Sequence, residues 1–417
     1  MIAPGATLGV LGGGQLGRMF ALAAHRLGYR VAVLDPDPDC PASAVANIHV
    51  CEALDCRAGW EVMADLCAAV TIETESVPAE ALEWFAGRMP VAPGAGGLRI
   101  AQDRAREKNF LAANGFAVAP YRVVGPAALS PSEEIDLLLP GLLKSSRFGY
   151  DGKGQFVVNW RAELAGAMRE LGGCCVLERR MNLAAELSVI LARAPGGDTA
   201  VYPVPLNRHV CGILDLSIVP APLPPEVVSR AISESLRLAA LLDYRGVLCV
   251  EFFLTREGEL LVNEIAPRPH NSGHFTLDAC HTSQFEQQVR VLAGMPLGDP
   301  GLIAPQSGVA MANLLGEFWA AGEPAWDKVL SAQNVRLHLY GKRDARPGRK
   351  MGHFTCLAGN PAEAETLAAN IRAAAGPLAA RRQAPQLQVM SGTSAKTRSS
   401  PVDQKPLMVE KYGSPSS

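Results

Sequence analysis

The feature that most constrains the fold is a pair of short apolar runs, VLCVEFFL and ELLVNEI, separated only by TREG. Runs of this length around a glycine turn predict a β-hairpin with Gly258 in its loop. If Glu257 and Gly258 are the loop residues, Glu251 lies directly opposite Glu264, with Cβ atoms about 5 Å apart. Two carboxylates that are so close inside apolar strands repel each other and lose hydration. A divalent cation between them removes both costs, because Mg²⁺ prefers carboxylate and phosphate oxygens.

This hairpin also has a plainer interpretation, in which one glutamate is solvated at a sheet edge and the other pairs with an arginine. On strict alternation, Asn263 faces the other side of the sheet unless the strand bends there. The segment that follows, APRPHNSGH, is polar and stiffened by prolines, which suits it to present side chains beside a metal. These side chains are Arg268, His270, Asn271 and Ser272.

A glycine-rich turn near the N-terminus lies between a short apolar run and a predicted helix. Gly12, Gly14 and Gly17 fit G-x-G-x-x-G, a pattern that lets backbone approach a phosphate at a helix N-terminus. Asp35 ends the next predicted strand, where a dinucleotide enzyme would hold a ribose hydroxyl. The pattern alone is weak, so a tight turn without a ligand is the alternative. The strand–helix–strand order predicts a doubly wound α/β domain.

A second glycine-rich stretch, KSSRFGYDGKGQ (144–155), lies between two other apolar runs. We predict a β-hairpin whose tip, with Gly149, Gly152 and Gly154, folds over a polyphosphate and donates backbone N–H groups to it. Lys144 ends the first strand, where its ammonium group can contact a charged oxygen. A surface hairpin without a ligand is the alternative.

The composition excludes several classes of function. The 417 residues carry a formal net charge of −2, so no overall field attracts nucleic acid or an anionic membrane. No uninterrupted apolar stretch is long enough to span a bilayer, and no signal peptide is evident. The ten cysteines show no C-x-x-C pair or metal-finger spacing. We therefore expect a cytoplasmic protein with reduced thiols and no nucleic-acid or membrane partner.

Five stretches resemble motifs of the ATP-grasp superfamily and, more closely, of its N5-carboxyaminoimidazole ribonucleotide synthase family. They are GGGQLGRM, TIETE, GYDGKGQ, NEIAPRPHNSGH and RPGRKMGH, in that order. The resemblance implies an ATP-grasp α/β fold, commonly as a homodimer. It also implies de novo purine biosynthesis, in which bicarbonate carboxylates the amine of 5-aminoimidazole ribonucleotide. In that reaction ATP is cleaved to ADP and phosphate by way of carboxyphosphate.

The order of predicted elements, together with the resemblance and the composition of the tail, divides the chain into four parts. Residues 1–100 are expected to form the N-terminal doubly wound α/β domain, and 101–190 a linker helix with a small lid domain that carries the flap. Residues 191–380 would form a C-terminal α+β domain with the metal and substrate sites. Residues 381–417, rich in Ser, Pro, Gln and Lys, are expected to be disordered.

The resemblance also implies which residues contact ATP. Glu178 and the backbone after it would line the adenine pocket, Glu186 would hold the ribose hydroxyls, and the flap would cover the phosphates. The full set is Arg104, Lys144, Gly149, Tyr150, Asp151, Gly152, Lys153, Gly154, Gln155, Glu178, Arg179, Arg180, Met181, Glu186, His209, Asn263 and Glu264.

The metal would be Mg²⁺, expected as two ions on Glu251 and Glu264, with Mn²⁺ as the alternative. Bicarbonate would be held by Arg268, His270 and Asn271, with Ser272 beside them.

The acceptor nucleotide would lie along the first glycine loop and the flap. Tyr150, Asp151 and Lys153 would face this nucleotide as well as ATP. Gln15 would line the same cleft, and either carboxylate of the TIETE motif, Glu73 or Glu75, would approach the aminoimidazole.

The segment YGKRDARPGRKMGH (340–353) concentrates Lys and Arg in a chain that is otherwise nearly neutral. It is either a solvated basic loop or the site of the acceptor's 5′-phosphate, with Lys342 and Arg349 as the predicted ligands.

Three other functions share part of this pattern. A formate-dependent glycinamide ribonucleotide transformylase would have the same fold and an acyl phosphate intermediate. A regulatory protein that has lost catalysis would bind the nucleotide without turnover. A dehydrogenase would use only the first glycine loop, with a nicotinamide cofactor.

Overall fold

The computed structural model describes residues 1–125, 133–147 and 154–375, and the predicted tail 381–417 lies outside the described residues. These residues form three β-sheets. None of the helices that can be described is long and apolar enough to cross a membrane.

The N-terminal region has the predicted doubly wound α/β arrangement. Its five parallel strands are ordered β3-β2-β1-β4-β5. The strands are β1 (Thr7–Leu11), β2 (Arg30–Leu34), β3 (Ile48–Val50), β4 (Ala69–Ile72) and β5 (Val91–Ala92), and the helices are α1 (Gln15–Arg26), α2 (Arg57–Leu66), α3 (Ala79–Ala86) and α4 (Ala95–Ala101). The strand order reverses between β1 and β4, and open α/β sheets bind ligands beyond the carboxyl ends of such strands. The glycine loop follows β1, and the TIETE motif (71–75) begins in the last two residues of β4 and continues beyond it.

A four-stranded antiparallel sheet, in the order β6-β9-β7-β8, carries the second glycine-rich hairpin. The helix α5 (Arg104–Ala113) precedes it and is N-capped by Asp103, whose side chain accepts from two backbone N–H groups. The other elements are β6 (Tyr121–Val124), α6 (Glu133–Asp136), β7 (Gly141–Ser145), β8 (Gln155–Val158), α7 (Arg161–Leu171) and β9 (Cys175–Arg179).

The third sheet has nine strands, in the order β15-β14-β10-β12-β13-β16-β18-β17, with β11 beside β10. Its strands are β10 (Leu183–Arg193), β11 (Thr199–Val201), β12 (Leu206–Val210), β13 (Ile213–Val219), β14 (Gly246–Thr255), β15 (Leu260–Ala266), β16 (Gly308–Leu315), β17 (Val335–Leu339) and β18 (Lys350–Ala358).

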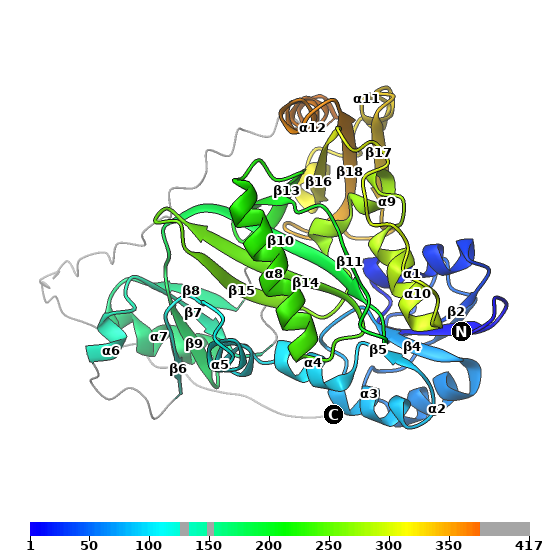
Figure 1. Cartoon of the computed structure of the whole chain (residues 1–417), viewed down its shortest axis with the longest axis horizontal. Coiled ribbons are helices and arrows are strands. Elements are labelled where there is room, and N and C mark those ends of the chain that lie inside the picture. Colours follow the sequence, from blue (N-terminus) through cyan, green and yellow to red (C-terminus); the bar gives the residue numbers. More distant parts are fainter. Residues whose placement is uncertain (126–132, 148–153, 376–417) are drawn as a thin grey trace, which may run out of the picture. The chain divides into compact units, whose positions relative to one another are not determined.

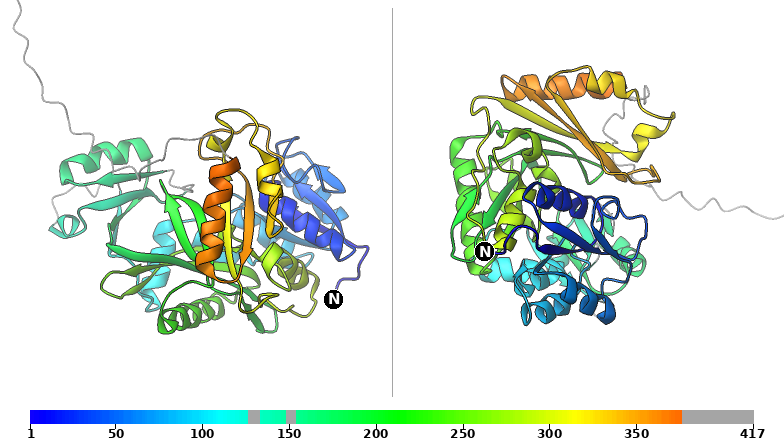
Figure 2. Two further views of the ribbon diagram at one scale, coloured as in Figure 1. Left: turned by 90° about the horizontal axis from the view of Figure 1, so that it is seen from above. Right: turned by 90° about the vertical axis from the view of Figure 1, so that its right-hand side faces the viewer.

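Helices cover parts of this sheet. The helix α8 packs against β10, β14 and β15 (Figure 1), and α12 packs against β16 and β18 (Figure 2). The helical segments are α8 (Pro225–Leu241), η1 (Asn271–Gly273), α9 (Thr276–Ala279), α10 (Gln284–Ala293), η2 (Gly316–Trp319), α11 (Trp326–Leu330) and α12 (Pro361–Ala375).

The helix α10 joins the first sheet to the third, since it packs against β4 and β5 as well as β10 and β14. Its buried residue Gln288 donates to the Thr71 hydroxyl (2.8 Å) and accepts from the Val247 N–H (2.6 Å). One apolar core contains residues of both sheets, among them Val10 and Val247. This packing holds the carboxyl ends of β1 and β4 beside the loop that follows β15.

The hairpin of β14 and β15 has a longer loop than the sequence predicts. Leu254 lies opposite Leu260, and the Thr255 N–H donates to the Glu259 carbonyl, so three residues, 256–258, form the loop. Gly258 has a φ of +86°, a conformation that glycine adopts without strain. The predicted two-residue loop is therefore wrong.

A β-bulge at Asn263 corrects the register. The register nearest the turn, if continued, would place Asn263 opposite Glu251 and Glu264 opposite Val250. A one-residue shift of that kind sends a side chain to the other face of the sheet. The bulge instead sets Glu251 opposite Glu264, so the predicted pairing is confirmed for a reason that alternation could not supply.

Candidate active site

The two paired glutamates lie on neighbouring strands, and each contacts a cation. Glu251, only 8% exposed, is 2.9 Å from Nε2 of His270 through Oε1. Glu264 is 3.3 Å from Arg104 through Oε2, and 39% of its side chain is exposed. Burial raises the pKa of Glu251, but His270 and His209 outweigh burial and lower that pKa to about 2. Glu251 is therefore suited to carry negative charge at neutral pH.

Asn263 supplies an unsatisfied oxygen at the bulge between them. Its side chain is 9% exposed, and Oδ1 has no hydrogen-bond partner among the described residues. A buried amide oxygen without a partner is costly, and ligands and ions commonly satisfy such atoms. Carboxylate and amide oxygens form the donor set that Mg²⁺ accepts. The residues present therefore fit the predicted metal, and Asn263 is the observation that supports the fit.

A cluster of cations surrounds Glu178, which is 2% exposed. Its carboxylate lies 3.0 Å from Lys144, 3.3 Å from Lys108 and 3.9 Å from Arg104. Burial raises the pKa of Glu178, but these cations together lower it to about 2. Burial also lowers the pKa of Lys144. Arg104 also contacts Glu264. Lys144 and Lys108 therefore share Glu178, and a nucleotide phosphate would neutralise the second of these two charges.

The flap itself lies mostly outside the described residues. This applies to Gly149, Tyr150, Asp151, Gly152 and Lys153. The flanking strands are present, and Lys144 pairs with Gln155 across β7 and β8 as the predicted hairpin requires. Gly154, with a φ of +69°, precedes β8.

The predicted adenine and ribose residues line adjoining strands. Arg179 ends β9, and Arg180 and Met181 follow it; the N–H groups of Arg179 and Arg180 donate to the carbonyls of Pro120 and Pro140. Glu186 on β10 lies 2.9 Å from Nδ1 of His209 on β12. Burial lowers the pKa of His209, and the hydrogen bond to Glu186 outweighs it and raises that pKa.

The loop after β15 is tied into the sheet by buried hydrogen bonds. His270 contacts Ser272 through Nδ1 (2.8 Å), and the Ser272 hydroxyl contacts that of Ser188 (2.7 Å). Asn271 and Asn313 exchange two amide hydrogen bonds, so the Asn271 side chain is already engaged within the protein. Burial lowers the pKa of His270, but Cys249 and Glu251 outweigh burial and raise it to about 10.

The first glycine loop holds a carboxylate of the protein itself. The N–H groups of Gly14 and Gly17 donate to Glu73, at 2.6 Å for Gly17, and the Gly13 N–H donates to Asp35 (2.7 Å). A Cβ on Gly14 would clash with the Glu73 carboxylate. Asp35, the residue that a dinucleotide enzyme would use for ribose, is thus bound within the turn. The loop is built around Glu73, which argues against the dehydrogenase alternative.

Other predicted acceptor residues meet across the first and third sheets. Lys342 donates to Oε1 of Gln15 (2.5 Å), although 327 positions separate them. Arg268 is 2.9 Å from Glu75. Arg349 donates to the carbonyl of Asp344 and therefore folds back onto its own loop.

Two buried charged residues of α5 were not predicted from the sequence. Lys108 is fully buried and donates to the Asn263 carbonyl (2.9 Å), and Glu107, 3% exposed, accepts from the Ile265 N–H (2.6 Å). Burial raises the pKa of Glu107 to about 8, although Arg104 acts in the opposite direction. Their spacing from Arg104, three and four residues, places all three on one helix face. This spacing is the signal that could have found them.

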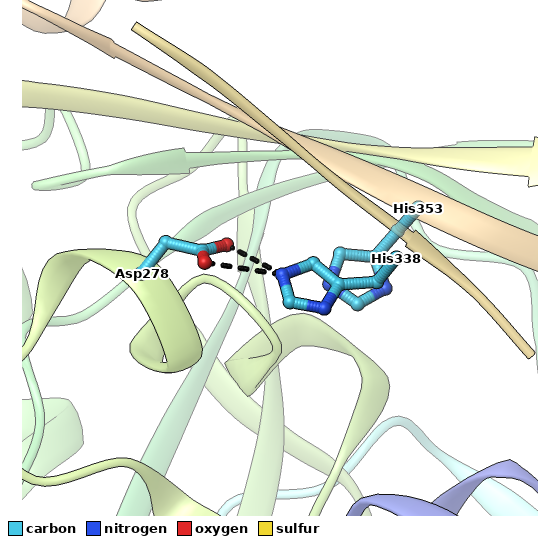
Figure 3. A group of neighbouring side chains, drawn as sticks. All are labelled: Asp278, His338 and His353. Carbon is cyan, nitrogen blue, oxygen red and sulfur yellow. Dashed lines mark hydrogen bonds and ion pairs between the residues drawn. The ribbon is translucent and has the colours of Figure 1, made fainter. Parts of the chain in front are cut away.

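A further group with metal-ligand spacing was not predicted. Figure 3 shows Asp278, His338 and His353, whose ligand atoms lie within 4.8 Å of one another. Nε2 of His338 donates to Asp278 (3.0 Å), and the rings of the two histidines stack with 13° between their planes. Imidazole lone pairs lie in the ring plane, so two stacked rings cannot both point at one ion. We therefore interpret the group as a stacked pair hydrogen-bonded to Asp278.

Comparisons with known proteins match three parts of the chain to family models. Residues 5–102 match a family model described as the ribonucleotide synthetase preATP-grasp domain, residues 109–285 the ATP-grasp domain, and residues 309–367 the phosphoribosylaminoimidazole carboxylase C-terminal domain.

Among full-length relatives, the N5-carboxyaminoimidazole ribonucleotide synthase of Bacillus subtilis is 41% identical over 358 residues, which are 86% of this chain and 93% of that protein. The solved ADP complex of an N5-carboxyaminoimidazole ribonucleotide synthetase is 40% identical, with a TM-score of 0.83, and covers 89% of this chain and 97% of its own. An Aspergillus clavatus synthase solved with ADP and 5-aminoimidazole ribonucleotide is 31% identical, with a TM-score of 0.80 over 88% of this chain and 98% of its own.

Proposed function

Because the chain belongs to the N5-carboxyaminoimidazole ribonucleotide synthase family of ATP-grasp ligases, we propose that its paired glutamates hold magnesium during an ATP-dependent carboxylation. The chain is a carbon–nitrogen ligase that carboxylates 5-aminoimidazole ribonucleotide in purine biosynthesis. The observation that carries the metal assignment is the register of Glu251 opposite Glu264, with the unsatisfied oxygen of Asn263 at the bulge beside them.

Glu251, Glu264 and Asn263 would hold the metal, as two Mg²⁺ ions or with Mn²⁺ in their place. Bound there, the metal would neutralise charge on the phosphates of ATP. Arg104 and Lys144 would contact the same phosphates, and Lys144 would leave Glu178 to do so. The flap amides would add hydrogen bonds once the hairpin closes over the nucleotide.

The carboxyl donor is proposed to be bicarbonate. One of its oxygens attacks the γ-phosphorus of ATP, the bond to the β,γ-bridging oxygen breaks, and ADP leaves with that electron pair. The product, carboxyphosphate, or the CO₂ that it releases, is attacked by the amine of the acceptor. A C–N bond forms, phosphate leaves and the nitrogen loses its proton. Carboxyphosphate reacts with water, so the closed flap would have to exclude solvent.

The loop after β15 is well placed to hold bicarbonate. Arg268 and His270 lie 2.9 Å from Glu75 and Glu251 respectively, which connects this loop with both glutamate pairs of the site. We assign bicarbonate to Arg268 and His270, while the hydrogen bonds of Asn271 and Ser272 hold the loop in place.

The acceptor nucleotide is proposed to lie between the first glycine loop and the basic segment. The hydrogen bond of Lys342 to Gln15 supports this placement, because it joins a predicted phosphate ligand to a residue predicted to line the same cleft. Glu73 and Glu75 both lie at the carboxyl end of β4, beside Arg268, so either can approach the aminoimidazole.

Release of ADP tests the assignment, with the aminoimidazole nucleotide and bicarbonate each omitted in turn. We expect turnover to need both. Turnover with formate in place of bicarbonate, or with glycinamide ribonucleotide as the acceptor, would transfer the chain to the transformylase alternative. Glu264→Gln is expected to abolish turnover and weaken Mn²⁺ binding, with the folded structure retained by circular dichroism.

The assembly and location expected from the resemblance, a homodimer in the cytoplasm, are part of the proposal. The ten cysteines are all free, which is typical of a reducing compartment. Light scattering behind size-exclusion chromatography tests the dimer by its mass.

A further inference from the structure

We propose that Glu107 and Lys108 of α5 are positioning residues for the nucleotide–metal site, because they hold the β-bulge that sets Glu251 opposite Glu264. The inference rests on the proposed metal site and adds to it the part of the chain that creates its geometry.

The strand β15 lies at the edge of the third sheet, so one side of its backbone has no neighbouring strand. Side chains of α5 satisfy that side at the bulge. Lys108 donates to the Asn263 carbonyl (2.9 Å), and the Ile265 N–H donates to Glu107 (2.6 Å). The two contacts fall on either side of Glu264, the residue whose direction the bulge decides. We call Glu107 and Lys108 the bulge clamp.

Burial of two charged side chains costs desolvation free energy, which indicates that Glu107 and Lys108 are needed for these particular contacts. Lysine and glutamate are rarely buried completely, yet Lys108 is 0% and Glu107 is 3% exposed. An apolar residue at either position would avoid the desolvation, but it would leave a backbone group of the bulge without a partner. Arg104, on the same helix face, contacts the Glu264 carboxylate directly (3.3 Å).

Without the clamp, the competing register of the hairpin becomes accessible. That register continues from the turn, places Asn263 opposite Glu251 and turns Glu264 to the other face. It keeps the apolar pairs between the turn and Phe252, so the chain would remain folded while the metal pair is lost. The clamp therefore affects metal binding more than it affects overall stability.

Lys108 also contacts Glu178 (3.3 Å), so its loss would disturb the adenine pocket too. Glu107 is the better position for a substitution that tests the clamp, since among the described residues its side chain is hydrogen-bonded to the Ile265 backbone alone. Burial raises the pKa of Glu107 to about 8, and a neutral side chain that keeps an accepting oxygen there should preserve the contact. Glu107→Gln has such an oxygen, whereas Glu107→Leu does not.

The experiment measures binding of Mn²⁺ to the full chain in the presence of ADP, by loss of the free-ion signal in electron paramagnetic resonance. Glu107→Leu is expected to weaken Mn²⁺ binding about tenfold, as for other outer-sphere supports of a metal, and Glu107→Gln by less than about threefold. Lys108→Met should weaken it as Glu107→Leu does. Arg106→Met, on the exposed face of α5, is the matched control and should leave it unchanged.

Hydrogen exchange of a peptide covering β15 provides the second readout, without metal or activity. Faster exchange of this peptide in Glu107→Leu than in Glu107→Gln is expected. Equal exchange and equal Mn²⁺ affinity in these two variants would overturn the clamp. If Glu107→Leu does not fold, hydrogen exchange of this peptide in Lys108→Met decides the proposal.

Glu264→Gln separates failure of the clamp from failure of the proposed metal site. Unchanged Mn²⁺ affinity in Glu264→Gln would remove the metal assignment itself, and the clamp with it. Weakened binding in Glu264→Gln, together with wild-type binding in both clamp variants, would overturn the clamp alone.

Discussion

Two carboxylates, Glu178 and Glu73, lie in the two proposed ligand-binding regions, and the protein surrounds them with different groups. Glu178 has three side-chain cations around it, and its pKa falls to about 2 against the effect of burial. Glu73 accepts hydrogen bonds from the N–H groups of Gly14 and Gly17. Burial raises the pKa of Glu73, and these N–H groups do not reverse the effect.

The two regions differ in whether the groups around the carboxylate can move to another partner. A lysine side chain can rotate from a carboxylate to a phosphate, so the Glu178 cluster can exchange partners when ATP binds. The N–H groups of the first loop are fixed at the start of α1 and cannot move without the helix. Glu73 is therefore held in a fixed position by the loop, whereas Lys144 is held by an ion pair that a phosphate can replace.

The largest effect is expected from Glu178→Gln, which leaves Lys144, Lys108 and Arg104 around an uncharged group. Removing one member of a buried ion pair costs about 3–5 kcal/mol. Chemical denaturation at pH 7 measures the free energy of unfolding. The KM for ATP should also rise, because the proposed adenine pocket loses the same side chain.

The dependence of the free energy of unfolding on acid pH tests whether lost charge causes that effect. The folded pKa of Glu178 lies below its usual value, so the stabilisation is complete above about pH 4.5 and is lost as the pH falls towards 2. The gap between wild type and Glu178→Gln should therefore narrow over this range. A gap that is constant with pH would mean that lost packing, and not lost charge, destabilises the variant.

The same comparison shows what the sequence could and could not predict. The glycine loop and the glutamates of the TIETE motif each follow a strand of the doubly wound sheet, so their meeting at one edge is predictable. The position of Glu73 inside the glycine loop is not predictable, because only the folded turn shows which acceptor the N–H groups of the loop bind. Lys144 was found because a glycine hairpin follows it.

Lys108 escaped prediction because a helix with charged residues at several positions resembles an exposed helix. Its burial depends on Glu178 and Asn263, which are far away in the sequence. The pairing of Glu251 with Glu264 was predicted from a loop length that is wrong, and the bulge compensated. Periodicity determines the hairpin, but a bulge depends on tertiary contacts that the pattern does not contain.

A smaller effect is expected from Glu73→Gln. The amide keeps one accepting oxygen but turns its NH₂ group towards a backbone N–H of the glycine loop. An unsatisfied donor pair of this kind costs about 2–3 kcal/mol. The KM for the aminoimidazole nucleotide should rise more than the KM for ATP, the reverse of the Glu178→Gln result. Equal changes in both constants would contradict the division of the site into two regions.

Gly14→Ala tests the rigidity of the first loop without touching a charge. Gly14 has a φ of −73°, which alanine also adopts, so only the clash with the Glu73 carboxylate matters. We expect a loss of about 1–2 kcal/mol by thermal denaturation. Gly96→Ala is the matched control, because its Cβ would meet open space within α4, and it should be neutral or stabilising.

The smallest effect is the pH dependence of Glu73 itself, which should have the opposite sign to that of Glu178. The folded pKa of Glu73 is raised, so its contribution is complete below about pH 4.5 and declines as the pH rises through the folded value. The free energy of unfolding of wild type, relative to Glu73→Gln, should therefore fall with rising pH above 4.5. If it rises instead, the backbone N–H groups and Arg268 outweigh burial, and Glu73 is stabilised as an anion in the same way as Glu178. The slope of this difference thus decides whether fixed dipoles can replace mobile cations around a carboxylate in this fold.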